Sequence, residues 1–464
     1  MDLLIKGGKI VTADAAFKAD IAVKNGKIAA IGVNIKPEAG AETVDAADKL
    51  VLPGAIDAHT HLAMPFGGTI SADDYEAGTR AAACGGTTTV FDFVLQDFGE
   101  SMVDAVKRRQ AICEPQAVVD YAFHVGVKDV SDGLLDTIDD SVKYGVPSFK
   151  VFMVYDFGVT DGVFYQVLEK SKKAGALIAV HAENNEMVNM LTRRFLSEGK
   201  TSAWYHYLSR SEFVEAEADE RAIQWAKSLN APLYIVHLAN KQGMDAVTKA
   251  RDEGYPIFAE TCPHYLYFTS DVYKREDGRN WVCSPPVKGR ESREALWSGV
   301  KRGDISTIAT DHCPFQQNEK DWGIDDFSKI PNGCAGIENM YPYMLSEANK
   351  GRITFNKAVE LCATNVAKIF GCAPQKGVLQ AGADADIVIY DPKKNFTIKN
   401  EFMHGNNDHT IWEGVELKGY PIATYSRGSL VYKDGEFLGS KGAGKFVKCK
   451  PIKLTGPDLR NIKF

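Results

Sequence analysis

The sequence predicts an α/β protein: a (β/α)8 TIM-like barrel with a small β-sandwich domain formed by the N- and C-terminal flanking segments. Between about residues 51 and 370, apolar runs typical of buried strands alternate with segments of helical length. Several of these runs end in a histidine or an aspartate. In a barrel of this kind, functional groups lie at the C-terminal ends of the strands. Both ends of the chain instead show short strands with turn signals between them.

The composition is that of an ordinary globular protein long enough for more than one domain. The 464 residues are 45% hydrophobic and 25% charged, with a formal net charge of −7. Because nucleic-acid binding requires a basic patch, we expect no nucleic-acid partner and a small-molecule substrate. No run approaches the length of a membrane span, and the N-terminus lacks a secretory leader. The nine scattered cysteines, odd in number and without a CxxC pair, indicate reduced thiols and a cytoplasmic protein.

The N-terminal segment, residues 1–53, predicts the first part of the β-sandwich. From Leu3 to Ile31, short apolar stretches flank turn signals such as Lys24-Asn25-Gly26-Lys27. An Asn-Gly pair between apolar stretches is typical of a tight hairpin. This opening does not alternate with helices, so we assign it to a sheet outside the barrel.

Residues 54–372 predict the barrel, which includes helical segments such as Ser101–Ile112 and Val163–Ala174. The longest insertion, from Asn184 to about Glu217, follows the fifth strand. The last helix is expected over Phe355–Phe370, with Gly371 as its stop. The eight expected strands cover residues 51–58, 87–93, 118–125, 148–154, 176–181, 232–237, 256–261 and 305–310.

The β pattern returns after Gly371. Residues 373–438 predict the second part of the β-sandwich, with a strand over 386–391 stopped by Pro392 and another over 428–433 that runs into an Asp-Gly turn. The tail, residues 439–464, is rich in lysine and irregular. It is either a solvated extension or a contact with another subunit.

The ends of the barrel strands carry metal-ligand chemistry. His59 and His61 are two residues apart at the end of the first strand, so both imidazoles point to the same face. His181, His237 and Asp311 end three later strands. Each histidine taken singly is compatible with a place in the core, but the recurrence favours a metal site. One open zinc site takes three protein ligands plus water, so these five residues suit two metal ions about 3.5–4 Å apart.

Lys150 interrupts the apolar run Ser148-Phe149-Lys150-Val151 on the fourth strand. A buried ammonium beside two cations is costly. A deprotonated lysine that reacts with carbon dioxide becomes a carbamate, an anion whose two oxygens can bridge two metals. Without the metal pair, a lysine that extends its ammonium to solvent explains the position equally well.

The order of these residues resembles the binuclear amidohydrolase superfamily. Within it, His59-Thr60-His61-Leu62-Ala63-Met64-Pro65-Phe66-Gly67-Gly68 and Phe149-Lys150-Val151-Phe152-Met153-Val154-Tyr155 are similar to the hydantoinase/dihydropyrimidinase family. So are Cys283-Ser284-Pro285-Pro286 and the stretch Pro331-Asn332-Gly333-Cys334-Ala335-Gly336-Ile337-Glu338. The resemblance covers essentially the whole chain, and it implies the same barrel and flanking β domain.

The resemblance implies a cofactor of two Zn²⁺ per subunit, bridged by N6-carboxylated Lys150 and a hydroxide. His59, His61 and Asp311 would hold one zinc, and His181 and His237 the other. It further implies a zinc-dependent cyclic amidohydrolase of the D-hydantoinase/dihydropyrimidinase type, which opens hydantoins or dihydropyrimidines to N-carbamoyl amino acids by attack of the bridging hydroxide. The family is commonly tetrameric, so a homotetramer or a dimer is expected.

The remaining site residues are also implied by the resemblance. Asp311 would transfer the proton from the attacking water to the leaving nitrogen, and Tyr155 would donate to the developing oxyanion. The backbone of Ser284 and Asn332 would bind the imide edge of the cyclic ureide. The ring substituent would face an apolar group: Leu62, Met64, Phe66, Phe152, Phe157 and Val159. His124 and His264 are expected to be core histidines or to lie behind the ligands.

Other functions share parts of this pattern. Allantoinase and other cyclic ureide hydrolases carry the same metal set. Dihydroorotase typically has an arginine two residues after the His-x-His pair to bind a substrate carboxylate, and Ala63 stands there in this chain. The non-enzymatic alternative is a scaffold protein related to dihydropyrimidinase. Such scaffolds typically lack several metal ligands, whereas all six positions are filled here.

Overall fold

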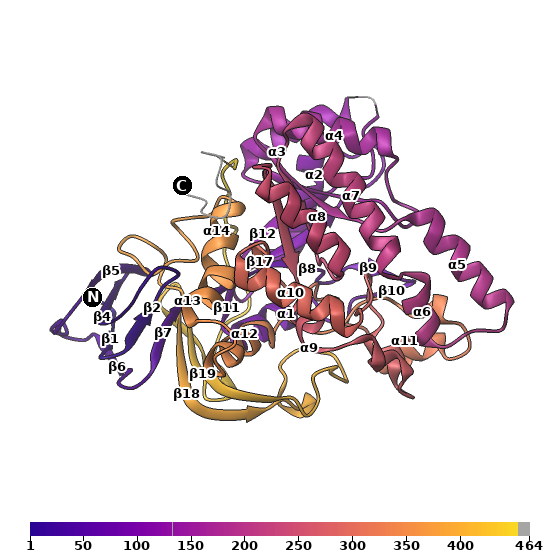
Figure 1. Cartoon of the computed structure of the whole chain (residues 1–464). Helices are drawn as coiled ribbons and strands as arrows, with labels where there is room; N and C mark the ends of the chain where they lie inside the picture. The colour runs from indigo at the N-terminus through magenta and orange to yellow at the C-terminus, as the bar shows by residue number, and fades with distance from the viewer. Residues whose placement is uncertain (132, 453–464) are drawn as a thin grey trace.

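Eight parallel strands form a barrel in the computed structural model, which describes residues 1–131 and 133–452 (Figure 1). Their order is β17-β16-β15-β14-β13-β12-β11-β8, so the strands follow one another around the sheet in sequence order. The barrel closes between its first and last strands through a parallel bridge of Thr60 with His312. The backbone N–H of His61 also donates to the carbonyl of His312 at 2.9 Å. The predicted (β/α)8 architecture is therefore confirmed.

The barrel strands agree with the eight predicted runs but differ at their ends. The strands that carry His237 and Asp311 stop earlier than predicted, so both residues lie in the turns that follow. The first run differs more, because Gly54 divides it between the two parts of the fold. A Cβ at Gly54 would overlap the side chain of Thr88, so the close approach there requires glycine. The barrel strands are β8 (Ala55–Thr60), β11 (Thr87–Leu95), β12 (Asp120–Gly126), β13 (Ser148–Phe152), β14 (Leu177–His181), β15 (Leu233–Ile235), β16 (Ile257–Thr261) and β17 (Thr307–Ile308).

The helices surround the barrel, and the two named in advance form as predicted. Ser101 and Thr160 cap α2 and α4, each accepting a hydrogen bond from a backbone N–H three residues later. The insertion after the fifth strand forms α5, α6 and the start of α7. The helices of the first half are α1 (Tyr75–Cys84), α2 (Met102–Cys113), α3 (Ile138–Tyr144), α4 (Asp161–Ala174), α5 (Asn185–Ser197), α6 (Ala203–Ser209) and α7 (Glu212–Leu229).

The predicted helix over residues 355–370 is present, but it is not a uniform α-helix. A π-helical segment, Glu360–Thr364, separates α13 from α14. The buried residues of this region pack against the barrel core. The remaining helices are α8 (Lys241–Asp252), α9 (Pro263–Tyr267), α10 (Arg290–Arg302), α11 (Gln317–Lys320), α12 (Met340–Asn349), α13 (Phe355–Val359) and α14 (Asn365–Ile369).

Two sheets beside the barrel form the predicted β-sandwich, built from both ends of the chain (Figure 1). One sheet has the order β5-β4-β1-β6 and the other the order β21-β20-β19-β18-β7-β2-β3. The strands from the two ends meet where β7 pairs antiparallel with β18, with Leu52 opposite Val388. Their strands are β1 (Leu3–Lys6), β2 (Lys9–Val11), β3 (Ala16–Lys18), β4 (Asp20–Lys24), β5 (Lys27–Gly32), β6 (Glu42–Asp45), β7 (Leu50–Pro53), β18 (Ile387–Thr397), β19 (Glu416–Ser426), β20 (Ser429–Lys433) and β21 (Glu436–Phe437).

Two turn predictions had different outcomes in this sandwich. Asn25 and Gly26 both have positive φ, of 51° and 72°, between β4 and β5, as a tight Asn-Gly hairpin requires. The prediction that Pro392 ends its strand was wrong, because β18 continues to Thr397. Its pairing with β19 shifts register between Asp391 and Asn395. An irregularity of this kind is where a strand tolerates proline.

The first part of the C-terminal tail covers the end of the barrel opposite the strand termini that carry the histidines. Phe446 packs against Phe123, with ring centroids 5.8 Å apart, and Val447 and Cys449 are buried in the apolar cluster that fills this end. The prediction of a solvated extension is therefore wrong for residues 439–452. Residues 453–464 lie outside the described part, so the prediction of a subunit contact is not tested there.

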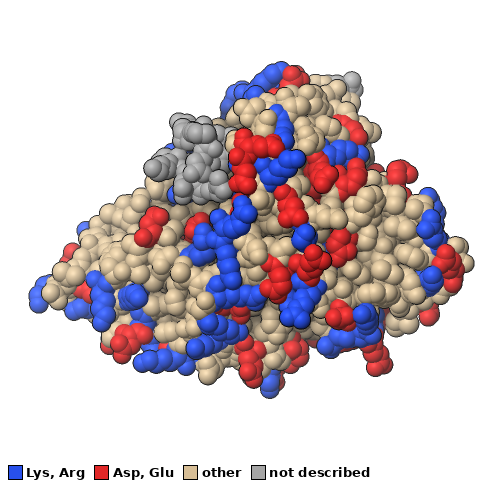
Figure 2. Space-filling model, in the orientation of Figure 1, with Lys and Arg blue, Asp and Glu red and all other residues tan. Residues whose placement is uncertain are grey.

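The surface mixes charges of both signs. On the face shown in Figure 2, acidic and basic side chains are interspersed. No helix in the described part of the chain is long and apolar enough to cross a membrane.

Candidate active site

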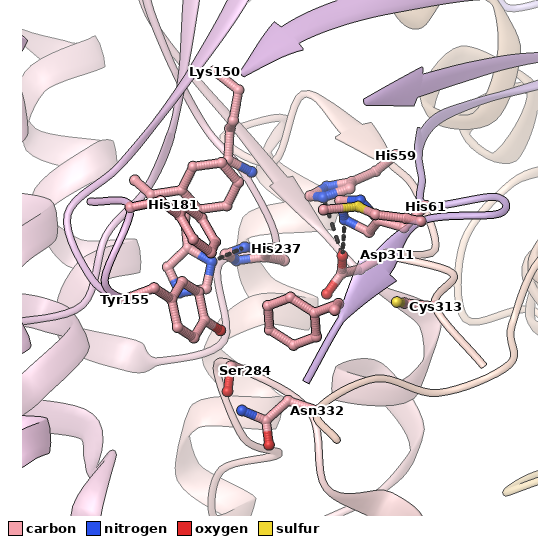
Figure 3. A pocket seen from close by; sticks show the side chains of 14 residues that line it. His59, His61, Lys150, Tyr155, His181, His237, Ser284, Asp311, Cys313 and Asn332 are labelled. Atoms are coloured by element: carbon pink, nitrogen blue, oxygen red, sulfur yellow. Dashed lines mark hydrogen bonds and ion pairs between the residues drawn. The ribbon is translucent and has the colours of Figure 1, made fainter. Parts of the chain in front are cut away.

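A pocket of about 450 Å³ lies at the C-terminal ends of the barrel strands. Figure 3 shows that the side chains of His59, His61 and Asp311 face those of His181 and His237 across the pocket. The sequence-predicted metal ligands are thus brought together, although they come from five separate strands or strand ends. The lining residues are His59, His61, Met64, Phe66, Lys150, Phe152, Tyr155, Phe157, His181, His237, Ser284, Asp311, Cys313 and Asn332.

His59, His61 and Asp311 form the first group of donor atoms. Oδ1 of Asp311 lies 3.1 Å from Nε2 of His59 and 3.0 Å from Nε2 of His61. Burial by itself lowers the pKa of His59, but the carboxylates of Glu260 and Asp311 outweigh it and raise the pKa. Burial likewise opposes ionisation of Asp311, and the two histidines nevertheless hold its pKa well below the ordinary value. Asp311 is therefore a carboxylate at neutral pH.

His181 and His237 form the second group, in which Nδ1 of His181 lies 3.0 Å from Nε2 of His237. Nε2 of His181 is hydrogen-bonded to Glu183 Oε2 at 2.7 Å. Burial and the neighbouring His181 lower the pKa of His237 well below its ordinary value. This imidazole is consequently neutral and able to act as a metal ligand.

The hydrogen bonds around the two groups fit bound cations. Nδ1 of His59 lies 2.7 Å from Oε1 of Glu260, which holds a proton on Nδ1 and leaves Nε2 as the atom that faces Asp311. Nε2 is buried and lies 3.1 Å from Oδ1 of Asp311. Without a metal ion, protonated His59 pairs with this carboxylate, in keeping with its raised pKa, and a bound cation would take the place of that proton. One donor atom from each of His59, His237 and Asp311 lies within 4.8 Å of the others, so the two groups belong to one centre.

Lys150 occupies the centre of β13 and is buried, with 1% of its surface exposed. Its ammonium lies over the rings of Phe93 and Phe152, at 4.7 and 5.1 Å from their centroids. Burial lowers the pKa of Lys150 to about 8, although Asp311 and Glu260 oppose this shift. The alternative that Lys150 extends its ammonium to solvent is therefore wrong. A neutral amine is accessible to this side chain near neutral pH.

Three non-glycine residues of the pocket have a left-handed backbone. φ is 77° at Tyr155, 39° at His237 and 51° at Asp311. Such conformations cost about 1–3 kcal/mol each and occur mainly where the surrounding structure imposes them at functional sites. Each of these residues follows the end of a barrel strand, so the turn directs its side chain into the pocket rather than around the barrel wall.

Tyr155, Ser284 and Asn332 lie near one another in the lining of the pocket (Figure 3). Burial raises the pKa of Tyr155, so its hydroxyl stays protonated and can donate. The loops of Ser284 and Asn332 are joined by the backbone N–H of Gly333, which donates to the carbonyl of Val282 at 2.9 Å.

Aromatic side chains form the wall expected for a ring substituent. Phe157 lies 5.1 Å from Phe152 and 5.3 Å from Tyr155 between ring centroids, and Phe66 lies 5.5 Å from Tyr155. Together with Met64, these residues line the pocket. The predictions for Leu62 and Val159 are corrected, because neither lines it. Leu62 is fully buried against Gly78 of α1, and Val159 packs on the core below.

Several residues of the site were not anticipated. Cys313, two residues after Asp311, lines the pocket. Behind the histidines, Glu260 and Glu183 are both fully buried, and Arg210 Nη1 donates to Glu183 Oε2 at 2.5 Å. A charged residue within an apolar strand was the signal that selected Lys150, and it applies equally to Glu260 in Ile257-Phe258-Ala259-Glu260.

The two other histidines considered in advance lie outside the pocket lining, as expected. His124 is buried, and its Nε2 donates to the carbonyl of Ala58 at 3.0 Å. Burial lowers its pKa to about 3, so it is neutral. His264 is also buried, with its ring 4.2 Å from that of Tyr265 between centroids.

A parallel barrel with clustered imidazoles, a carboxylate and a buried lysine at its strand ends is the architecture of a metal-dependent hydrolase. The model of the amidohydrolase family matches residues 50–431. The chain belongs to the amidohydrolase family, and this membership implies a binuclear metal centre for which the clustered residues are the candidates.

Individual relatives extend over nearly the whole chain. D-hydantoinase of Geobacillus stearothermophilus is 41% identical over 97% of this chain and 96% of its own length. D-phenylhydantoinase of Escherichia coli O1:K1 / APEC is 38% identical over 97% of this chain and 99% of its own. The crystal structure of dihydropyrimidinase from Brevibacillus agri NCHU1002 superposes with a TM-score of 0.96 at 39% identity, and the match covers 98% of this chain and all of that one.

Proposed function

We propose that this chain is a zinc-dependent cyclic amidohydrolase of the D-hydantoinase/dihydropyrimidinase type, which opens 5-substituted hydantoins or dihydropyrimidines to N-carbamoyl amino acids. The observation that carries the proposal is the convergence of four imidazoles, Asp311 and Lys150 on one pocket whose outer wall is aromatic. Relatives named for this activity, at about 40% identity over nearly the full chain, support the substrate class.

We infer that the two groups of donor atoms hold two Zn²⁺ ions. His59, His61 and Asp311 would bind one ion, and His181 and His237 the other. Lys150 would bridge them as a carbamate, formed when its neutral amine attacks carbon dioxide and releases one proton. The pKa of about 8 supports this step, because a substantial fraction of the amine is neutral near pH 7–8. When bound, the metal pair lowers the pKa of water and polarises the amide carbonyl.

The chain's own residues would then move the protons. Water adds to the cyclic amide carbonyl and the C–N bond of the ring breaks; one proton of the water goes to the leaving nitrogen, and the other is released as the new carboxyl group ionises to a carboxylate. Asp311 is ionised and would accept the proton of the attacking water and pass it to the leaving nitrogen. Tyr155, which remains protonated, would donate to the oxygen that becomes negative.

Substrate orientation would depend on the two ends of the pocket. The backbone of Ser284 and Asn332 would bind the imide edge of the ring, which places its 5-substituent against Phe66, Phe152 and Phe157. This wall is apolar and edge-on aromatic contacts stabilise aryl groups, so a phenyl substituent suits it. The D configuration is proposed from the relatives named D-hydantoinase and D-phenylhydantoinase.

The direct test compares three substrates with the zinc-loaded full-length protein: 5-phenylhydantoin, dihydrouracil and allantoin. We expect hydrolysis of the first two, D-N-carbamoylphenylglycine as the chiral product, about two zinc ions per chain, and loss of activity on chelation. An inactive zinc-loaded protein would contradict the proposal, and preferential turnover of allantoin would replace it with allantoinase. A chain that binds no zinc would favour the scaffold alternative.

We also propose the organisation of the whole protein. Residues 54–372 would form the barrel domain, residues 1–53 and 373–438 the two parts of the sandwich, and residues 439–464 a separate C-terminal segment. A homotetramer or dimer in the cytoplasm fits the family, and the nine cysteines, which are all buried and unpaired, suit a reducing compartment. Light scattering on the purified protein measures the subunit number.

A further inference from the structure

Around the candidate centre, the buried carboxylate of Glu260 contacts residues of both donor groups, His59 and His237. We propose that Glu260 is a positioning residue that joins the two metal positions, so that retention of either ion depends on this one carboxylate. The inference rests on the proposed function, because it takes His59 and His237 as ligands of different ions.

Both oxygens of Glu260 are engaged within the barrel. Oε1 lies 2.7 Å from Nδ1 of His59 and accepts a hydrogen bond from the backbone N–H of His237 at 3.0 Å. Oε2 accepts from the hydroxyl of Tyr234 at 2.8 Å, and that hydroxyl lies 2.6 Å from Thr307 Oγ1. Glu260 is fully buried on β16, between the strand that leads to His237 and the strand that leads to Asp311. Its carboxylate therefore has one fixed geometry.

The two bonds to Oε1 act on different properties of the two ligands. The bond from Nδ1 of His59 fixes the tautomer of that ring and leaves the lone pair on Nε2, toward Asp311. The bond from the N–H of His237 holds a backbone whose φ is 39°, which an ordinary residue adopts only under constraint. Loss of the carboxylate would thus release a ring at one metal position and a turn at the other.

Glu183 provides a matched comparison within the same site. Its Oε2 lies 2.7 Å from Nε2 of His181 and accepts from Arg210 Nη1. Like Glu260 it is a fully buried carboxylate that faces a ligand histidine. Unlike Glu260, it contacts a ligand of only one metal position. If loss of a buried negative charge is all that matters, removing the charge of Glu183 or of Glu260 should have the same effect on zinc release. If Glu260 joins the two metal positions, only the Glu260 variant should affect both ions.

The experiment follows zinc release from the holoenzyme into a chromogenic chelator. We expect the wild type to release two equivalents slowly. Glu260→Gln keeps the shape but loses the charge that holds the proton on His59, and it should accelerate both equivalents about 10- to 100-fold, the usual cost of removing a partner behind a metal ligand. Glu183→Gln should accelerate one equivalent and leave the other unchanged. Tyr234→Phe, which removes a hydroxyl bonded to Glu260 and Thr307 but to none of the candidate ligands, controls for altered packing.

The outcomes separate this inference from the proposed function. A wild type that holds fewer than two zinc ions would contradict the proposed function itself. If the wild type holds two ions but Glu260→Gln releases only one of them faster, or neither, then Glu260 does not join the two metal positions. The same pattern in Tyr234→Phe as in Glu260→Gln would also overturn that role, in favour of core packing. If Glu260→Gln does not accumulate as folded protein, Glu260→Asp gives the same readout, because the shorter carboxylate cannot reach both His59 and His237.

Discussion

Removal of the Tyr155 hydroxyl tests the chemistry without disturbing the metal centre. In Tyr155→Phe the ring keeps its contacts with Phe66, Phe157 and His181, at centroid distances of 5.5, 5.3 and 5.4 Å. The substitution removes only the hydroxyl. Loss of one donor to an oxyanion typically costs about 2.7–4 kcal/mol, which is about 10²–10³ in kcat. We expect a loss of this size with KM nearly unchanged.

The assay is steady-state hydrolysis of 5-phenylhydantoin, with zinc measured on the same samples. Ser284→Ala is the matched control, because it removes another hydroxyl from the lining of the same pocket and leaves that of Tyr155 in place. It should lower kcat much less than Tyr155→Phe. If the kcat of Tyr155→Phe stays within about fivefold of the wild-type value, a difference of about 1 kcal/mol in activation free energy, Tyr155 does not stabilise the oxyanion. Loss of zinc from that variant would instead assign Tyr155 a structural role.

Three further predictions concern charge. Lys150→Ala should lose most zinc and activity, and bicarbonate with a short-chain carboxylic acid should restore part of the activity; full activity without additives would exclude the bridge. Lys376→Met should lower the free energy of unfolding by about 3–5 kcal/mol in urea titrations, because it leaves buried carboxylates without their cation. Lys376 Nζ lies 2.5, 2.7 and 3.1 Å from the carboxylates of Asp120, Asp386 and Asp384. Adding Asp120→Asn should recover part of the loss, and an unchanged stability of Lys376→Met would contradict the prediction. Burial and the nearby Arg210 lower the pKa of His206 to about 3. Below pH 6.5 the unfolded chain therefore binds a proton that the folded chain does not, and the free energy of unfolding should fall by about 2 kcal/mol as the pH is lowered from 6.5 to 5. His206→Gln should lose that part of the pH dependence, and a pH profile identical to that of the wild type would contradict the prediction.

The barrel was predictable because its signal is repeated. Each strand is a short apolar run, and the runs that end in His181, His237 and Asp311 point to the same end of the barrel. The sandwich was predictable from the Asn25-Gly26 hairpin and the β pattern at both ends. The boundary between sandwich and barrel was expected at residue 54, but the pattern did not show that the strand expected over residues 51–58 is divided there, because the apolar run continues across it. The close approach of Thr88 from the next strand explains why glycine occupies the position of the break.

The candidate ligands were predictable to the residue, but the pocket wall was not. Leu62 and Val159 belong to loops, where sequence spacing does not determine the direction of a side chain. The buried partners Glu260 and Glu183 were visible as charges in or beside apolar strands. Their roles depend on which histidine ring nitrogen each carboxylate faces. That contact is set by how the strands pack and joins residues far apart in the sequence, such as His59 and Glu260.

The alternative that this cluster is only a polar core can be weighed from its energetics. A structural core gains little from four imidazoles gathered around one pocket, where Nδ1 of His181 lies only 3.0 Å from Nε2 of His237. It would also have no reason to hold His237 and Asp311 in left-handed conformations, which cost about 1–3 kcal/mol each. Lys150 adds a buried amine whose pKa is lowered to about 8. The strained backbones and the buried amine belong to residues that line the same pocket. A pair of cations bound in that pocket would offset their free-energy costs. Metal binding should accordingly stabilise the folded chain, whereas a polar core would be indifferent to it.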